Sequence, residues 1–105
     1  MKAVFSFKKE LEIDGHEFTI DTRNIKAKEV QHLANNILDL RKKVRDGTIE
    51  DAEVIEAYQA AIDYILAEGA SETIFGKEGG TVKSCDDLLM FLTNELKNAN
   101  TTAGK

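Results

Sequence analysis

Residues 27–68 constrain the fold more than any other stretch, because they indicate two long amphipathic helices with a very short connection. Within each half, apolar residues recur at three- and four-residue steps, the spacing of one face of an α-helix. The two apolar faces consist of Val30, Leu33, Ala34, Ile37, Leu40 and Val44, and of Ala52, Ile55, Tyr58, Ile62, Ile65 and Leu66. A loop this short predicts that the two helices run antiparallel and pack against each other.

The expected ends of these helices follow from capping patterns. Thr22 or Asn24 is a suitable N-cap for the first helix, and Gly47 is a good residue just beyond its C-terminus. Thr48 followed by Asp51 is close to a capping box and predicts the start of the second helix, which we expect to end at Gly69.

A β-hairpin is expected before the first helix. Phe5, Phe7, Leu11 and Ile13 share one parity, and the polar–apolar alternation resumes with His16, Phe18 and Ile20. Between them, Asp14-Gly15 is a strong signal for a two-residue type I′ turn, which places Ile13 opposite His16. The predicted hairpin therefore has one apolar face, and we expect that face to cover the first helix.

The C-terminal third predicts a short helical turn, a glycine-rich loop and a third, shorter helix. Ser71 opens the turn, and Ser84 with Asp87 repeats the capping-box pattern before the apolar stripe of the third helix. Residues 98–105 are small and polar, so we expect a frayed tail after a single domain over residues 1–97. The predicted fold is α+β: an N-terminal β-hairpin packed on an antiparallel helical hairpin, plus the third helix.

Composition excludes several classes of protein. The net charge of −5 argues against nucleic acid or an acidic membrane surface as the main partner. A single cysteine, Cys85, rules out a fold stapled by internal disulfides. Because no stretch approaches the roughly 20 apolar residues of a membrane helix, and the N-terminal apolar run is too short for a signal peptide, we expect a cytoplasmic protein.

No residue pattern indicates catalysis, a cofactor or a metal. The glycine-rich segment 76–81 places Lys77 before its glycine pair, which is not the order of a phosphate-binding loop. His16 and His32 lack the spacing of zinc ligands. Cys85 stands beside Asp86 and Asp87, which do not activate a thiol, so we expect no enzyme.

Two apolar features exceed a single helical stripe. The third helix has Leu89, Met90 and Phe91 in succession, and Ile74-Phe75 lies between glycines. Either these residues complete the core, or they form a patch for self-association or for a partner helix. The candidate partner-binding residues are therefore Ile74, Phe75, Leu89, Met90 and Phe91.

The order of these elements resembles the tail assembly chaperones of long-tailed bacteriophages and prophages, especially those of Gram-positive hosts. The resemblance covers most of the chain. It rests on the hairpin stretch ELEIDGHEFTID, on the motif Glu-Gly-x-x-x-x-Ile-Phe-Gly at residues 68–76, and on the stretch DDLLMFLTNEL at residues 86–96.

This resemblance implies a small, mostly helical, non-enzymatic protein of the host cytoplasm that self-associates. Such chaperones coat the long helical tape measure protein, keep it soluble, and release it as tail tube subunits polymerise around it. Many also exist in a longer, frameshifted form. Because the family has no catalytic residues, none are carried over to this chain.

Three other functions stay open at the level of sequence. A structural phage component, such as a tail-completion or head–tail connector subunit, has the same α+β build and forms an oligomeric ring. A small DNA-binding regulator requires a basic helix, and the basic cluster at residues 41–45 lies at a helix C-terminus. An enzyme requires machinery that the sequence does not show.

Overall fold

An antiparallel pair of strands precedes four helices, which confirms the α+β class. The computed structural model describes residues 8–77 and 79–103. The elements are β1 (Lys8–Ile13), β2 (His16–Asp21), α1 (Ala27–Arg45), α2 (Asp51–Ile65), α3 (Ala70–Phe75) and α4 (Val82–Ala103). Phe5 and Phe7, which we expected to extend the hairpin, lie outside the described residues.

The hairpin has the register that its turn predicts. Ile13 pairs with His16 and Leu11 with Phe18, which leaves the like-charged Glu12 and Glu17 opposite each other. Asp14 and Gly15 both have positive φ angles, 51° and 81°, as a type I′ turn requires.

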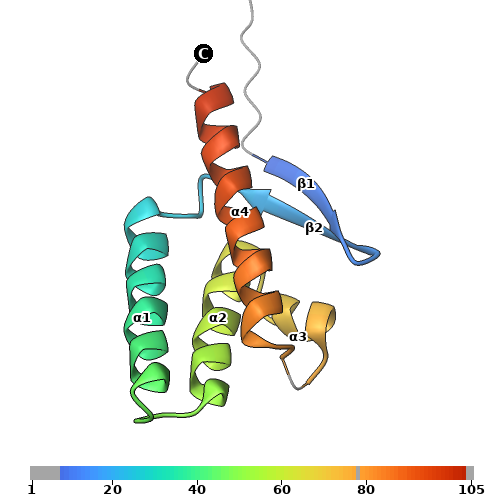
Figure 1. Cartoon of the computed structure of the whole chain (residues 1–105). Coiled ribbons are helices and arrows are strands. Elements are labelled where there is room, and N and C mark those ends of the chain that lie inside the picture. The colour runs from blue at the N-terminus through green and yellow to red at the C-terminus, as the bar shows by residue number, and fades with distance from the viewer. Residues whose placement is uncertain (1–7, 78, 104–105) are drawn as a thin grey trace, which may run out of the picture.

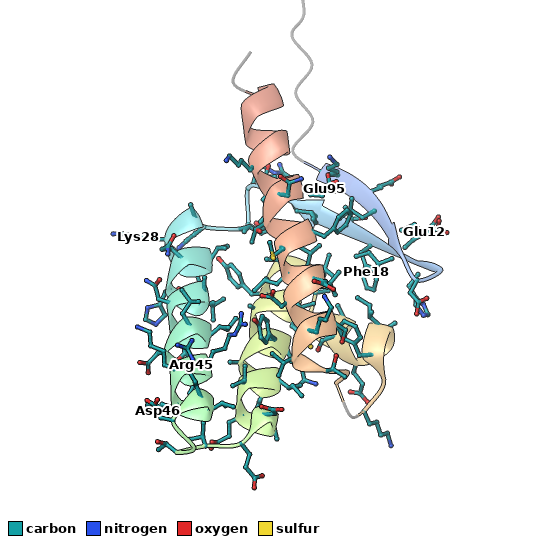
Figure 2. All side chains as sticks on the ribbon, viewed as in Figure 1. Glu12, Phe18, Lys28, Arg45, Asp46 and Glu95 are labelled. Atoms are coloured by element: carbon teal, nitrogen blue, oxygen red, sulfur yellow. The ribbon has the colours of Figure 1, made fainter. Side chains whose placement is uncertain are left out.

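The position of the hairpin differs from the prediction that its apolar face covers the first helix. The hairpin lies beside α4, on the side of α4 away from α1 (Figure 1). The Lys9 ammonium forms an ion pair with the Glu95 carboxylate of α4. Phe18 extends from the hairpin toward the helices, whereas Glu12 points away from them (Figure 2). The prediction was wrong because α4 lies between the hairpin and α1 (Figure 1).

The antiparallel pair of α1 and α2 is present, and α2 lies at the centre of the molecule (Figure 1). Tyr58 and Ile62 of α2 are 1% and 0% exposed, and they join the same core as Ile37 of α1, Leu92 of α4 and Ile20 of β2. Ala52, which we expected in the core, is exposed because its position is rotated away from the stripe that Tyr58 and Ile62 define.

The helix ends follow the predictions only in part. Gly47 follows α1 with φ +78°. Its N–H donates to the Val44 carbonyl oxygen, and the Thr48 N–H donates to the Lys43 carbonyl oxygen. These two hydrogen bonds form a Schellman motif. The N-cap of α1 is Lys26, not Thr22 or Asn24. The N-cap of α2 is Glu50, so the predicted Thr48–Asp51 capping box is wrong.

The N-terminus of α1 is completed by a side chain from a distant part of the chain. The Lys26 backbone N–H donates to the hydroxyl oxygen of Tyr64 in α2, at 3.0 Å. Similarly, the Ser71 N–H at the start of α3 donates to the Asp63 carboxylate of α2, at 2.8 Å. The second half of α2 therefore satisfies backbone groups of two neighbouring helices.

The C-terminal helix begins earlier and is longer than expected. A capping box forms between Thr81 and Ser84, because each backbone N–H donates to the hydroxyl oxygen of the other residue, at 2.9 and 3.1 Å. The capping box therefore lies three residues before the predicted one between Ser84 and Asp87. With 22 residues, α4 is longer than the 19-residue α1, and the stretch up to Ala103 that we expected to fray belongs to this helix.

Candidate protein-binding face

The helices form an incomplete bundle. Both α1 and α4 pack closely against α2, but they pack far less closely against each other. In the view of Figure 1, α2 lies between α1 and α4. We call the facing sides of α1 and α4 the α1–α4 face.

The α1–α4 face begins with a hollow beside the N-terminus of α1. Its volume is about 150 Å³, and its lining residues come from the β2–α1 connection, α1 and α4: Thr22, Ile25, Ala27, Val30, Gln31 and Leu96. The lining is predominantly apolar, which suits the side chains of a protein partner better than a polar ligand.

Two exposed apolar side chains extend this face along the two helices. Leu38 of α1 is 56% exposed and Met90 of α4 is 62% exposed. Arg41 and Asp86 mark the facing sides of α1 and α4, because they form an ion pair across the gap. Leu38 lies three residues before Arg41, and Met90 lies four residues after Asp86, so helical spacing places both on these facing sides.

A polar cluster connects all three helices within this face. The Tyr58 hydroxyl of α2 donates to the Asp86 carboxylate at 2.8 Å, and the Arg41 guanidinium donates to the Tyr58 oxygen at 3.3 Å. The Arg41 nitrogen lies 3.6 Å from the same carboxylate. Burial, and then the hydrogen bond to Asp86, raise the pKa of Tyr58 to about 12. The phenol therefore stays protonated at neutral pH and holds the helices at a fixed spacing.

Basic side chains edge this face on α1. Arg41 and Arg45 lie one turn apart on this helix. On α4, the carboxylate of Asp86 pairs with Arg41, and that of Asp87 pairs with Lys83.

The structure separates the five residues that the sequence indicated as a patch. Ile74 and Phe75 are half-buried and pack against the core, and Leu89 is only 9% exposed. Met90 and Phe91 are exposed, but on different flanks of α4. Phe91 lies one turn before Glu95, which pairs with the hairpin residue Lys9, whereas Met90 lies one turn after Asp86, which pairs with α1.

Leu38 and the polar cluster were missed by sequence reasoning. Leu38 is apolar but does not belong to the apolar face predicted for α1. This feature of the sequence could have indicated an exposed apolar side chain. Tyr58 was assigned only to an apolar face, and Asp86 was considered only as a neighbour of Cys85. Their partner Arg41 lies 17 residues from Tyr58, so the sequence contains no local sign of the contact.

Cys85 is a core residue. It is 0% exposed, and its Sγ donates to the Gly79 carbonyl oxygen at 3.1 Å. Burial raises the pKa of the Cys85 thiol, which keeps it protonated and unreactive. The neighbouring aspartates, which we expected to raise this pKa, are not its cause.

A second hollow lies on the hairpin. Its volume is about 470 Å³, and it is lined by Glu10, Leu11, Glu12, Glu17, Phe18 and Thr19. Within residues 8–77 and 79–103, no three histidine, cysteine or acidic side chains come together as metal ligands. None of the helices in this part of the chain has the length and apolar content needed to cross a membrane.

Comparisons of this chain with protein-family models, with curated proteins and with solved structures found no match. The functional interpretation therefore depends on the geometry above and on the resemblance noted from the sequence.

Proposed function

We propose that this protein is a non-enzymatic tail assembly chaperone of a long-tailed phage or prophage, which binds the tape measure protein in the host cytoplasm and keeps it soluble. The observation that supports this function best is the α1–α4 face, where Leu38 and Met90 are more than half exposed although the core beside them is well packed. We take these two exposed apolar side chains, with the apolar hollow farther along the same helices, as the partner-binding surface.

The physics of the task fits such a face. A tape measure protein is long, helical and rich in apolar residues, so its helices expose apolar stripes before the tail tube surrounds them. A chaperone must cover these stripes reversibly, which requires a small apolar contact area rather than a deep pocket. The net negative charge of this chain helps the resulting complex to stay dispersed.

Co-expression tests this function. The wild-type chain is produced together with the longest helix-rich, apolar-rich protein encoded by the same genome, and the soluble fraction of that partner is measured with and without this chain. We expect the partner to become soluble and to co-elute with this chain as a large complex. A partner that stays insoluble, while this chain elutes alone as a ring of defined size, contradicts the chaperone function and favours a structural component of the tail.

A further inference from the structure

We infer that the α1–α4 face binds an amphipathic helix of a partner protein whose flanks are acidic, and that this helix lies along α1 and α4 as a fourth helix of the bundle. This inference deepens the proposed function, because it rests on a helical partner and specifies the chemistry of the segment that is recognised.

The packing of the three long helices provides the place for a fourth. Since α2 has α1 on one side and α4 on the other, a helix lying over the α1–α4 face contacts both of them. Leu38 and Met90 project from the two walls, and the hollow beside Ala27 and Leu96 accepts a large apolar side chain. The 19 residues of α1 span about 28 Å, so the bound segment is about five turns long.

Charge specifies the flanks of the bound helix. Arg41 and Arg45 edge the face on α1. Asp39 of α1 pairs with Lys43 on an outer side of the helix. Glutamate or aspartate residues beside the apolar stripe of a partner therefore meet cations on the α1 wall.

A second copy of this chain is a poorer occupant. Its described helices bury their apolar stripes in its own core, and the large apolar side chains left exposed are Leu38, Met90 and Phe91. Two α1–α4 faces packed against each other place Arg41 and Arg45 of one copy near the same cations of the other, and like charges at an interface are costly. The occupant is therefore a segment of a different protein.

A designed peptide of about 20 residues tests the apolar part of this inference. Its helix has leucine at the heptad a and d positions and glutamate on both flanks. We expect Leu38→Lys and Met90→Lys each to weaken binding at least about tenfold in fluorescence anisotropy. Phe91→Lys is the matched control: Phe91 is exposed on the opposite flank of α4, so this variant should change the affinity less than about twofold. Circular dichroism checks that all variants stay folded.

The preference for acidic flanks on the bound helix is tested with a separate control peptide. A second peptide with lysine in place of each glutamate should bind at least about tenfold more weakly than the acidic peptide, and the affinity of the acidic peptide should fall as salt is added. Arg45→Glu should weaken acidic-peptide binding by several-fold, whereas Lys43→Glu, on the outer side of α1, should have little effect.

Three outcomes overturn the inference: equal binding of the two peptides, loss of binding in Phe91→Lys with Met90→Lys unaffected, and no binding of either peptide. Failure of this inference is distinguishable from failure of the proposed function. A chain that solubilises the tape measure protein but ignores both peptides keeps its function and loses this binding mode. A chain that binds the acidic peptide but leaves the tape measure protein insoluble keeps the binding mode and loses the function.

Discussion

Tyr58 shows how one side chain can combine burial with a polar role. Its ring lies in the core, 1% exposed, while its hydroxyl donates to Asp86 and accepts from Arg41. Helical periodicity correctly indicated that Tyr58 faces inward. It could not indicate the hydrogen bonds, because both partners come from other helices that the chain brings together only on folding.

The raised pKa of Tyr58 makes stability depend on pH in the alkaline range. Its value rises from 10.0 to about 12, so the protonated phenol stabilises the fold fully below pH 10. This contribution, ~2 kcal/mol, is lost progressively as the pH rises from about 10 toward 12. We therefore expect the stability advantage of the wild type over Tyr58→Phe to shrink across this window in urea unfolding. An advantage that stays constant to pH 12 contradicts the assigned pKa.

Gly79 is required for the contact between the loop before α4 and the body of α2. A Cβ at this position would collide with the Gln59 side chain and lie 3.0 Å from Ile55, and the residue has φ +80°. We expect Gly79→Ala to reduce the free energy of unfolding by more than about 1 kcal/mol.

Gly47→Ala is the matched control for Gly79→Ala. Gly47 has nearly the same φ, +78°, but no atom lies within 4 Å of the Cβ position. Because both variants incur the backbone strain, the difference between them in urea unfolding measures the collision with α2. Equal losses would show that the loop moves aside freely.

At the scale of elements, the sequence predicted correctly the hairpin turn and the end of α1, which depend on neighbouring residues. The turn Asp14-Gly15 was sufficient for the type and register of the hairpin, since a two-residue turn fixes every pair along the two strands. Gly47 likewise gave the end of α1. The start of α1 could not be predicted, because its N-terminal N–H is satisfied by Tyr64, which lies 38 residues away from Lys26.

The capping box of α4 gives a direct test of which residues begin that helix. We expect Ser84→Ala or Thr81→Ala to reduce the free energy of unfolding by ~1 kcal/mol, because each removes a hydroxyl that accepts from a backbone N–H.

Asp87→Ala serves as the comparison, since the sequence pattern alone made Asp87 the partner of Ser84. In the structure its carboxylate accepts from Lys83 on the exposed surface, at 3.3 Å, so its loss should cost only a few tenths of 1 kcal/mol. Thermal unfolding of the three variants ranks them. A larger effect of Asp87→Ala than of Thr81→Ala would contradict the observed cap.

At the scale of the whole molecule, the sequence predicted the parts better than their arrangement. The apolar face of the hairpin could in principle cover α1 or α4, and both helices offer an apolar stripe. The ion pair between Lys9 and Glu95 joins the hairpin to α4, and the sequence contains no local sign of it, because the two residues lie near opposite ends of the described chain. The candidate patch was only partly located, because Met90 and Phe91 are adjacent in sequence but the packing of α4 gives them different neighbours.

The central claim is that a partner helix lies on the α1–α4 face, and methyl NMR of this 11.7 kDa chain during titration with the acidic peptide tests it most directly. The account predicts that shift changes concentrate at Val30, Leu38 and Met90, with Leu11 and Ile13 of the hairpin unaffected. Changes that concentrate at the hairpin methyl groups, or no changes at saturating peptide, would contradict it.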